Sequence, residues 1–106
     1  MTAIPRAVRL AVYTRDQGRC QACGKNLEHE LWYSIQHRKA RGVGGQNNLE
    51  NLILVCGSAT SRGCHRKCED RDPEMIERGF VVRSWDDETL VPVTLWDGTR
   101  VSLATS

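Results

Sequence analysis

Aromatic residues, long apolar runs and an excess of one charge are all scarce in this 106-residue chain. Aromatics make up 6% of it, with a single Phe, and 15 Lys and Arg nearly balance 13 Asp and Glu. No apolar run approaches the ~18 residues that a membrane-spanning helix needs. Because the first residues also lack the apolar stretch of a signal peptide, we expect a cytoplasmic protein without a membrane segment.

The length allows one small domain, residues 1–106, with a core of limited size. A chain this short buries only about two-thirds of the surface that its unfolded form exposes, so packing alone stabilises it marginally. Five cysteines are the obvious source of further stabilisation. Their odd number argues against a disulfide framework, and intracellular cysteines more often bind metal or do chemistry.

The near-zero net charge conceals an uneven distribution along the chain. Residues 1–71 hold 12 Lys and Arg against 6 Asp and Glu, a balance of +6. Residues 72–106 hold 3 against 7, a balance of −4. A basic segment before an acidic tail favours an anionic partner for the first two-thirds of the chain, whereas an ordinary solvated surface is the alternative interpretation.

Local signals predict an α+β domain. A helix is expected at 5–17, because Pro5 suits a first turn, Gly18 ends the segment, and an apolar stripe recurs at helical spacing. That stripe comprises Ala7, Val8, Ala11 and Val12. The elements expected next are a strand at 31–37, a loop at 38–51, a strand at 52–55, a polar loop at 56–63, a short helix at 64–70 and a turn at 74–78.

The C-terminal extension, residues 79–106, is predicted to form a small β-meander. Its strands are expected at 80–85 and within 90–103, where Asp97-Gly98 between apolar segments is a strong two-residue hairpin signal. We expect this meander to cover the core. Trp85 and Trp96 are accordingly expected to be packing residues rather than platforms for a stacked ligand.

The cysteines are spaced as in a zinc site. Cys20 and Cys23 stand two residues apart, which lets both thiolates face one Zn²⁺ at ~2.3 Å. Cys56 after an apolar strand and Cys64 at the next helix start are the preferred second pair of a structural zinc site. Cys68, about one turn further on, is the alternative fourth ligand and otherwise a packing residue. A redox dithiol is the weaker interpretation of Cys20 and Cys23, since no βαβ setting is apparent.

Two of the three histidines stand where chemistry is expected. His29 lies in a charged stretch and is expected at the surface. His37 ends a predicted strand beside a Gly-rich loop, and His65 directly follows Cys64, so zinc binding would hold it in place. Asn51 precedes the strand that leads to Cys56.

These residues carry a resemblance to a known family. Gln36-His37-Arg38, Gly44-Gly45, Asn51-Leu52 and Cys64-His65 together resemble the HNH nuclease motif, within a core of about 15–70. The strings HRKARGVGG, NLILVCG and GCH further resemble small HNH proteins of actinobacteria and their phages. The resemblance implies a ββα-metal fold, in which two strands and a helix surround one divalent ion and four cysteines hold a bracing zinc.

The resemblance also implies a role for each residue. His37 would be the general base that deprotonates a water attacking a DNA phosphodiester, as neutral imidazole is available at cellular pH. Asn51 would fix the loop around it, and His65 would bind a catalytic Mg²⁺, Mn²⁺ or Ni²⁺. Gln36 departs from the motif, which has Asp or His there. Its amide oxygen can still ligate a hard cation, and Glu69, four residues after His65, is a candidate for the missing carboxylate, with a solvated surface role as the alternative.

Basic residues beside the proposed base favour DNA as the partner. Arg38, Lys39 and Arg41 are expected to contact phosphates, which positions a substrate without reading its sequence. The expected activity is metal-dependent nicking or cleavage of DNA in a bacterial or phage-infected cell, with a phage packaging terminase as a candidate partner. The alternative is a non-catalytic DNA-binding or assembly module held together by zinc, which Gln36 favours.

Overall fold

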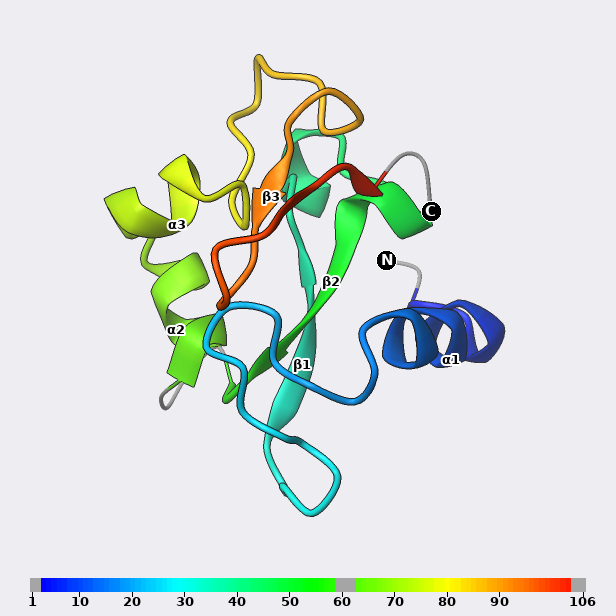
Figure 1. Ribbon diagram of the computed structural model, residues 1–106. Helices are drawn as coiled ribbons and strands as arrows, with labels where there is room; N and C mark the ends of the chain where they lie inside the picture. Colours follow the sequence, from blue (N-terminus) through cyan, green and yellow to red (C-terminus); the bar gives the residue numbers. More distant parts are fainter. Residues whose placement is uncertain (1–2, 59–62, 104–106) are drawn as a thin grey trace.

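The computed structural model describes residues 3–58 and 63–103 and has two helical regions on either side of a β-hairpin (Figure 1). Helix α1 (Arg6–Arg15) is shorter than predicted, because the chain turns into the left-handed region at Gln17 and Gly18, with φ of 59° and 63°. Val12 is the single buried residue of the predicted apolar stripe. The end of α1 is the part tied to the hairpin, since the Asp16 carboxylate accepts the Leu54 N–H at 2.9 Å.

The central hairpin pairs β1 (Tyr33–His37) with β2 (Leu52–Cys56) in antiparallel register, from Tyr33 opposite Cys56 to His37 opposite Leu52. Every residue of β2 is buried, as a short continuous apolar run predicts, whereas β1 is only partly covered. The long connection between the strands contains two single turns of 3-10 helix, Arg41–Val43 and Leu49–Asn51. Both predicted strands are therefore confirmed.

Two short helices follow β2 on the side of the hairpin away from α1 (Figure 1). Helix α2 (Gly63–Glu69) agrees with the predicted helix, and the part of the predicted polar loop at 59–62 lies outside the described residues. Helix α3 (Pro73–Glu77) replaces the predicted turn. It begins with Pro73 in its first turn and with the Asp72 carboxylate accepting the Glu74 N–H at 2.9 Å.

The predicted C-terminal meander is reduced to one hairpin in the described part of the tail. Strands β3 (Val93–Thr94) and β4 (Arg100–Val101) pair around the Asp97-Gly98 turn, as expected. The strand predicted at 80–85 is wrong: no strand forms there. Its N–H groups bond to separate elements instead of to one neighbouring strand, since Phe80 donates to the Met75 carbonyl and Val82 to the Arg38 carbonyl.

The two tail tryptophans differ from each other. Trp85 is 76% exposed, with the Arg83 guanidinium 5.8 Å from its ring centroid, so the prediction that it packs on the core is wrong. Trp96 lies over Gly24, where an added Cβ would come within 2.5 Å of the indole ring. Trp96 therefore covers the turn that carries Cys20 and Cys23, and only glycine allows this close approach.

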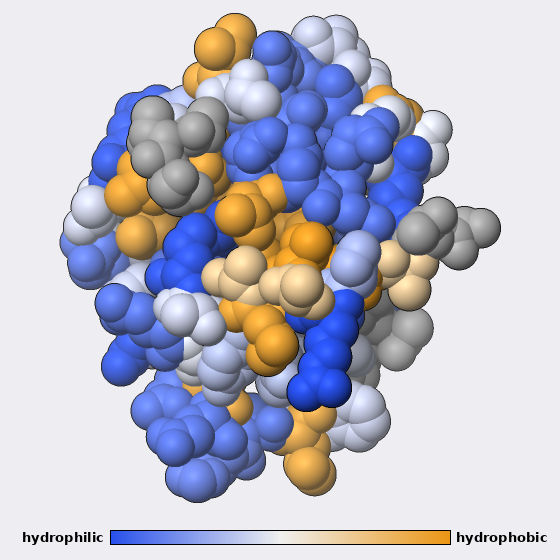
Figure 2. All heavy atoms as spheres, turned by 90° about the vertical axis from the view of Figure 1, so that its right-hand side faces the viewer, coloured by the Kyte–Doolittle hydropathy of each residue, from blue (hydrophilic) through white to orange (hydrophobic). Residues whose placement is uncertain are grey.

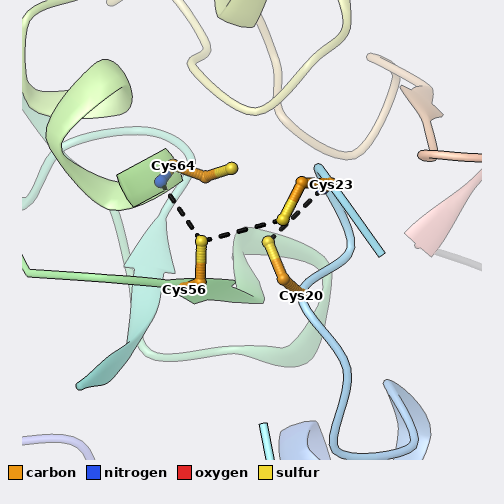
Figure 3. Close-up of side chains that lie close together, drawn as sticks. All are labelled: Cys20, Cys23, Cys56 and Cys64. Atoms are coloured by element: carbon orange, nitrogen blue, oxygen red, sulfur yellow. Dashed lines mark hydrogen bonds between the residues drawn. The ribbon is translucent and has the colours of Figure 1, made fainter. Parts of the chain in front are cut away.

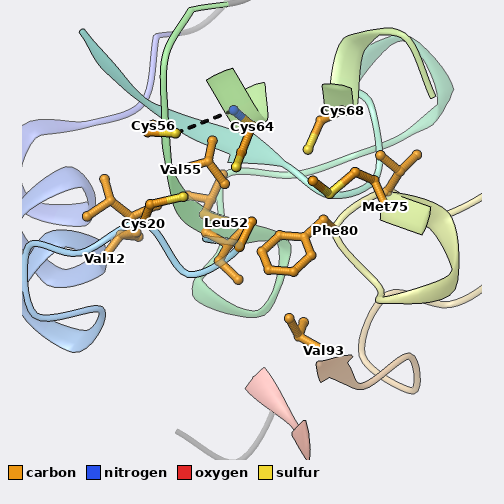
Figure 4. Close-up of a cluster of buried hydrophobic side chains, with 14 of the residues drawn as sticks. Val12, Cys20, Leu52, Val55, Cys56, Cys64, Cys68, Met75, Phe80 and Val93 are labelled. Atoms are coloured by element: carbon orange, nitrogen blue, oxygen red, sulfur yellow. Dashed lines mark hydrogen bonds between the residues drawn. The ribbon is translucent and has the colours of Figure 1, made fainter. Parts of the chain in front are cut away.

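A single buried cluster joins these elements (Figure 4). Val12 from α1, Leu52 and Val55 from β2, Met75 from α3 and Phe80 meet in it, and four of the five cysteines are buried with them. The fold is thus a small α+β domain in which cysteine sulfurs form part of the core. Among the described residues, no helix has both the length and the apolar character needed to cross a membrane.

Candidate functional site

Four cysteines from three separate segments converge at one point (Figure 3). The Sγ atoms of Cys20, Cys23, Cys56 and Cys64 all lie within 4.8 Å of one another. Cys20 and Cys23 come from the turn after α1, Cys56 ends β2, and Cys64 lies at the start of α2. Sulfurs of a tetrahedral zinc site with ~2.3 Å bonds are about 3.8 Å apart. The Cys23 and Cys56 sulfurs are 3.8 Å apart, so this donor set is consistent with a structural zinc site.

The surroundings of these sulfurs favour a thiolate at Cys20, whereas burial raises the pKa of Cys23 to about 11 and the hydrogen bond to Cys20 raises the pKa of Cys64. The backbone N–H of Cys23 donates to Cys20 Sγ and that of Cys64 to Cys56 Sγ, each at 3.4 Å. Such N–H···S bonds orient metal-ligating thiolates. In the protein alone, a hydrogen bond from the Cys64 thiol lowers the pKa of Cys20 to about 5, although burial acts in the opposite direction.

The fifth cysteine stands apart from this cluster. Cys68 is buried, 3% exposed, and its place one turn after Cys64 keeps it out of the four-sulfur group. Burial raises the pKa of its thiol to about 12, so it remains protonated. The structure thus brings together the preferred four cysteines and leaves Cys68 as a packing residue.

A second group of predicted residues surrounds an open cleft between β1 and α2, which we call the histidine cleft. It has a volume of about 460 Å³. Its walls comprise Ile35, Gln36, His37, Arg38, Ala40, Arg41, His65, Cys68, Glu69, Arg71 and Val81. Residues that are 28 positions apart in the sequence, His37 and His65, therefore share one solvent-accessible hollow. The α2 helix that carries Cys64 also presents His65, so the four-cysteine cluster positions one wall of the cleft.

His37 is the last residue of β1, and its imidazole is held by a neighbour from the connecting loop. Its Nε2 lies 2.7 Å from Asn47 Oδ1. With this oxygen as acceptor, Nε2 carries the proton and Nδ1 keeps the lone pair. Asn47 was not among the predicted site residues. The only signal in the sequence was its place in the Asn47-Asn48 pair, and such a pair is typical of any loop.

Asn51 closes the long loop back onto the end of β1. It is fully buried; its Oδ1 accepts the Lys39 N–H at 2.8 Å, and its Nδ2 donates to the Lys39 carbonyl at 3.1 Å and the Gln46 carbonyl at 3.0 Å. Gly45 makes the loop tight enough for this, because a Cβ there would lie 1.8 Å from the Lys39 oxygen. The amide thereby fixes the backbone two residues after His37.

His65 and Glu69 are adjacent on α2, with 3.6 Å between His65 Nε2 and Glu69 Oε1. Burial lowers the pKa of His65, so the neutral imidazole predominates near neutral pH. Its Nδ1 is buried without a hydrogen-bond partner among the described residues. Across the cleft, the Gln36 amide donates to the Phe80 carbonyl at 3.4 Å. These three side chains together offer an imidazole, a carboxylate and an amide oxygen.

Two of the three predicted phosphate-contacting side chains point elsewhere. Arg38 is 1% exposed, and its guanidinium donates to the carbonyls of Gly79, Glu50, Glu88 and Val91. Burial lowers the pKa of this guanidinium to about 10, which leaves it charged at neutral pH. Lys39 Nζ lies 3.7 Å from Glu88 and donates to the Asp86 carbonyl. Both side chains link the tail to the hairpin, because they bond to backbone carbonyls and to a carboxylate of residues 79–91.

Replacing Arg38 by methionine is expected to destabilise the fold by about 3 kcal/mol or more, because several buried carbonyls lose their donor. Thermal unfolding followed by circular dichroism should show a midpoint lower by more than about 10 °C. The matched control is Arg41→Met on the half-buried cleft arginine, with an expected change within about 1 kcal/mol. Equal midpoints for both variants would contradict a structural role for Arg38.

Arg41 remains at the cleft, and Arg71 joins it there. Sequence reasoning missed Arg71. It lies between α2 and α3 with a φ of 54°, a conformation that brings the chain round to the cleft. The only local hint was the Asp72-Pro73 helix start that follows it.

The histidine cleft therefore combines two imidazoles, one carboxylate, one side-chain amide and three arginines, of which Arg38 has its guanidinium bonded to backbone carbonyls. Such a set can bind a divalent cation and a phosphate side by side, and it can accept a proton at His37 Nδ1. No protein-family model, no curated protein and no solved structure matches this chain.

Proposed function

We propose that this protein is a metal-dependent HNH endonuclease that hydrolyses DNA phosphodiester bonds within a ββα-metal arrangement of β1, β2 and α2. The observation that carries the proposal is that His37 and His65 line one cleft, while Asn51 holds the loop beside His37. A binding module has no evident need for this combination. The order His, Asn, His within a four-cysteine frame also agrees with the family resemblance.

His37 acts as the general base in this proposal. Its Nε2 proton is bonded to Asn47 Oδ1, so Nδ1 is the atom that accepts a proton from the attacking water. Asn47 and Asn51 act as positioning residues: the first orients the ring, and the second holds the backbone of the loop that follows it. This arrangement restricts the imidazole before substrate arrives, which lowers the entropic cost of reaching the reactive geometry.

His65, Gln36 and Glu69 are the proposed ligands of a divalent cation such as Mg²⁺, Mn²⁺ or Ni²⁺. The donor set fits, since His65 Nε2 and Glu69 Oε1 lie 3.6 Å apart, close enough for one cation to contact both, and Gln36 lines the same cleft. A bound cation supplies positive charge that stabilises the phosphate in the transition state. With Gln36 in place of an acid, Glu69 is the one anionic group of the proposed set.

Arg41 and Arg71 are the proposed phosphate contacts of the histidine cleft. This revises the set expected from the sequence, because the buried guanidinium of Arg38 and the paired ammonium of Lys39 are committed to the tail. Two contacts at the cleft position a scissile phosphate but carry no base specificity. A preference for particular DNA sites would have to come from another surface or a partner.

A structural Zn²⁺ on Cys20, Cys23, Cys56 and Cys64 is part of the proposal. The cluster joins the turn after α1, the end of β2 and the start of α2, the three segments whose relative placement shapes the histidine cleft. Zinc bound to such a set commonly stabilises small domains that lack a large core.

A plasmid-nicking assay tests the proposed activity. Supercoiled plasmid incubated with the zinc-loaded protein is expected to become nicked or linear with added Mg²⁺, Mn²⁺ or Ni²⁺, and to stay supercoiled without added ion. The electrophoretic ratio of the three plasmid forms measures the rate. If no ion supports cleavage although the protein shifts DNA on a gel, the non-catalytic DNA-binding module, which Gln36 favours, becomes the better proposal.

Gln36→Asp is expected to raise the affinity of the proposed site for the added divalent ion. The new carboxylate adds a negative charge to the cleft that His65 also lines, so half-maximal nicking should need about tenfold less added ion, because a charged oxygen ligand binds a hard cation more strongly than an amide oxygen does. Gln46→Asp, an equal change in the exposed part of the loop, is the control and should leave the ion requirement unchanged. A Gln36→Asp variant with an unaltered requirement would remove Gln36 from the metal site.

A further inference from the structure

A second hollow lies on the face that carries α1, and we call it the α1 hollow. It has a volume of about 280 Å³ and is lined by Arg6, Arg9, Leu10, Tyr13, Tyr33 and Ile35. Figure 2 presents this face, with hydrophobic atoms gathered in its middle and strongly hydrophilic atoms beside them. Apolar and aromatic side chains are thus open to solvent next to positive charge.

The positive charge beside this hollow is not neutralised. Arg6 and Arg9 are both exposed, α1 contains no acidic residue, and in the described part of the chain neither guanidinium forms an ion pair. Leu10 is 54% exposed and Tyr33 is 40% exposed. Arginine at the rim of an exposed apolar surface suits an anionic partner that also has flat apolar faces.

Two tyrosines shape the hollow. The rings of Tyr13 and Tyr33 have centroids 5.8 Å apart and are inclined by 55°. One ring comes from α1 and the other from β1, so the pair is held by two elements that the core fixes together. A tilted pair of this kind presents a ring face and a ring edge to whatever enters, which is suited to receiving an unpaired base.

The α1 hollow adjoins the histidine cleft. Ile35 belongs to the wall of both. Tyr33, Ile35 and His37 are alternate residues of β1, so their side chains leave the same side of the strand. Four residues of strand span ~13 Å, which is the reach of no more than about four nucleotides at ~3.4 Å each.

We infer that the α1 hollow binds a single-stranded segment of the nucleic acid whose phosphate lies in the histidine cleft. This inference rests on the proposed nuclease function. Arg6 and Arg9 contact phosphates of that segment, and Tyr13 and Tyr33 receive an unpaired base. Proteins usually bind single strands with a basic groove that contains aromatic side chains. In a duplex the base faces are stacked on one another, so they cannot pack against the apolar side chains of the α1 hollow. The substrate class is therefore DNA with an unpaired stretch within about four nucleotides of the cleaved bond.

Binding is tested with the zinc-loaded full chain and no added divalent ion. Fluorescence anisotropy compares a labelled thymidine oligonucleotide with a labelled hairpin duplex of equal charge. Tyr33→Ala should weaken binding of the oligonucleotide about tenfold, the loss typical of removing one stacking side chain, and leave the duplex within about twofold. Trp85→Ala, a more exposed aromatic outside both hollows, is the matched control and should change neither.

The arginines are tested by salt dependence. Arg6→Ala combined with Arg9→Ala should reduce the slope of log affinity against log salt for the single strand by about 1.4, since each lost phosphate contact contributes about 0.7. Arg100→Ala, an exposed arginine on β4, should leave the slope unchanged. Unchanged melting curves establish that these variants fold.

The outcomes separate this inference from the nuclease proposal. If wild-type protein nicks plasmid but Tyr33→Ala and the double arginine variant bind the oligonucleotide normally, the inference is overturned and the nuclease proposal stands. Equal losses for oligonucleotide and duplex on Tyr33→Ala also overturn it. If these variants lose single-strand binding as expected but no ion supports nicking, the hollow is a nucleic-acid site and the nuclease proposal fails.

Discussion

Replacing Cys64 by alanine is expected to abolish zinc binding and cooperative folding. Zinc bound by four cysteines contributes on the order of 10 kcal/mol to small domains, which is comparable to the whole stability of a typical domain. Cys64 is one of four sulfurs that lie within 4.8 Å of one another, so its loss removes the link between α2 and the rest of the cluster. Metal analysis should fall from about one zinc per chain to a small fraction, and the thermal transition should disappear.

Cys68→Ala is the matched control for this experiment. Cys68 is buried on the same helix four residues later and undergoes the same chemical change, but its sulfur lies outside the four-sulfur group. We expect this variant to keep its zinc and to lose only about 1 kcal/mol of stability, as for a small packing residue. The reverse result, with zinc lost from Cys68→Ala and kept in Cys64→Ala, would show that the cluster is assigned to the wrong cysteines.

Acidification of the wild-type protein should release the same zinc. Metal-bound thiolates have pKa values well below those of free thiols, so protons compete with zinc only as the pH falls. The stability that zinc confers is therefore present at neutral pH and lost towards acid. Zinc released to a colorimetric chelator should coincide with loss of the circular dichroism signal. Complete unfolding before any zinc appears would indicate that the metal is not what holds the domain together.

His37→Ala is expected to lower the nicking rate by about 10²–10⁴-fold, the usual contribution of a general base. The histidine is half-buried at the end of β1 and bonded to a single loop side chain, Asn47, so its removal should leave the fold intact. Plasmid nicking at saturating metal ion measures the rate, and circular dichroism checks the fold. Melting temperature and zinc content should match the wild type.

His29→Ala provides the control for this variant. His29 is exposed and lies outside the histidine cleft, so the same substitution there should leave nicking unchanged. Full activity of repurified His37→Ala would exclude it as the base. Loss of activity together with loss of zinc would mean that the substitution acts through the fold, and Asn47→Ala would then test the proposed orientation of the ring, with a smaller expected loss.

The predictions that succeeded concern segments whose signals are short. The Cys20–Cys23 spacing, the apolar run of β2 and the Asp97-Gly98 turn each act over a few residues, and each element lies where it was expected. The proximity of His37 to His65 was not readable from spacing. It followed from a resemblance, and the cleft they share is formed by the packing of α2 against β1.

The predictions that failed concern residues whose environment is supplied from far along the chain. Arg38 looked like a surface arginine because its neighbours are basic and the loop is rich in glycine. Instead it is buried, and its guanidinium donates to four carbonyls, three of them from residues 79–91. The segment 80–85 has strand-like composition, but the N–H groups of Phe80 and Val82 donate to carbonyls of α3 and of Arg38, the residue after β1, instead of to one neighbouring strand.

The sequence by itself determined the elements that local chemistry specifies: a helix between a proline and a glycine, two apolar strands, a two-residue turn and a pair of thiols able to face one ion. Tertiary structure decided which sulfurs meet, with Cys64 included and Cys68 excluded by one helical turn. It also decided that Arg41 and Arg71 line the open cleft, whereas Arg38 is buried and bonded to backbone carbonyls. The reason is physical: backbone conformation depends on neighbours in sequence, whereas burial and side-chain partners depend on which distant segments the core brings alongside.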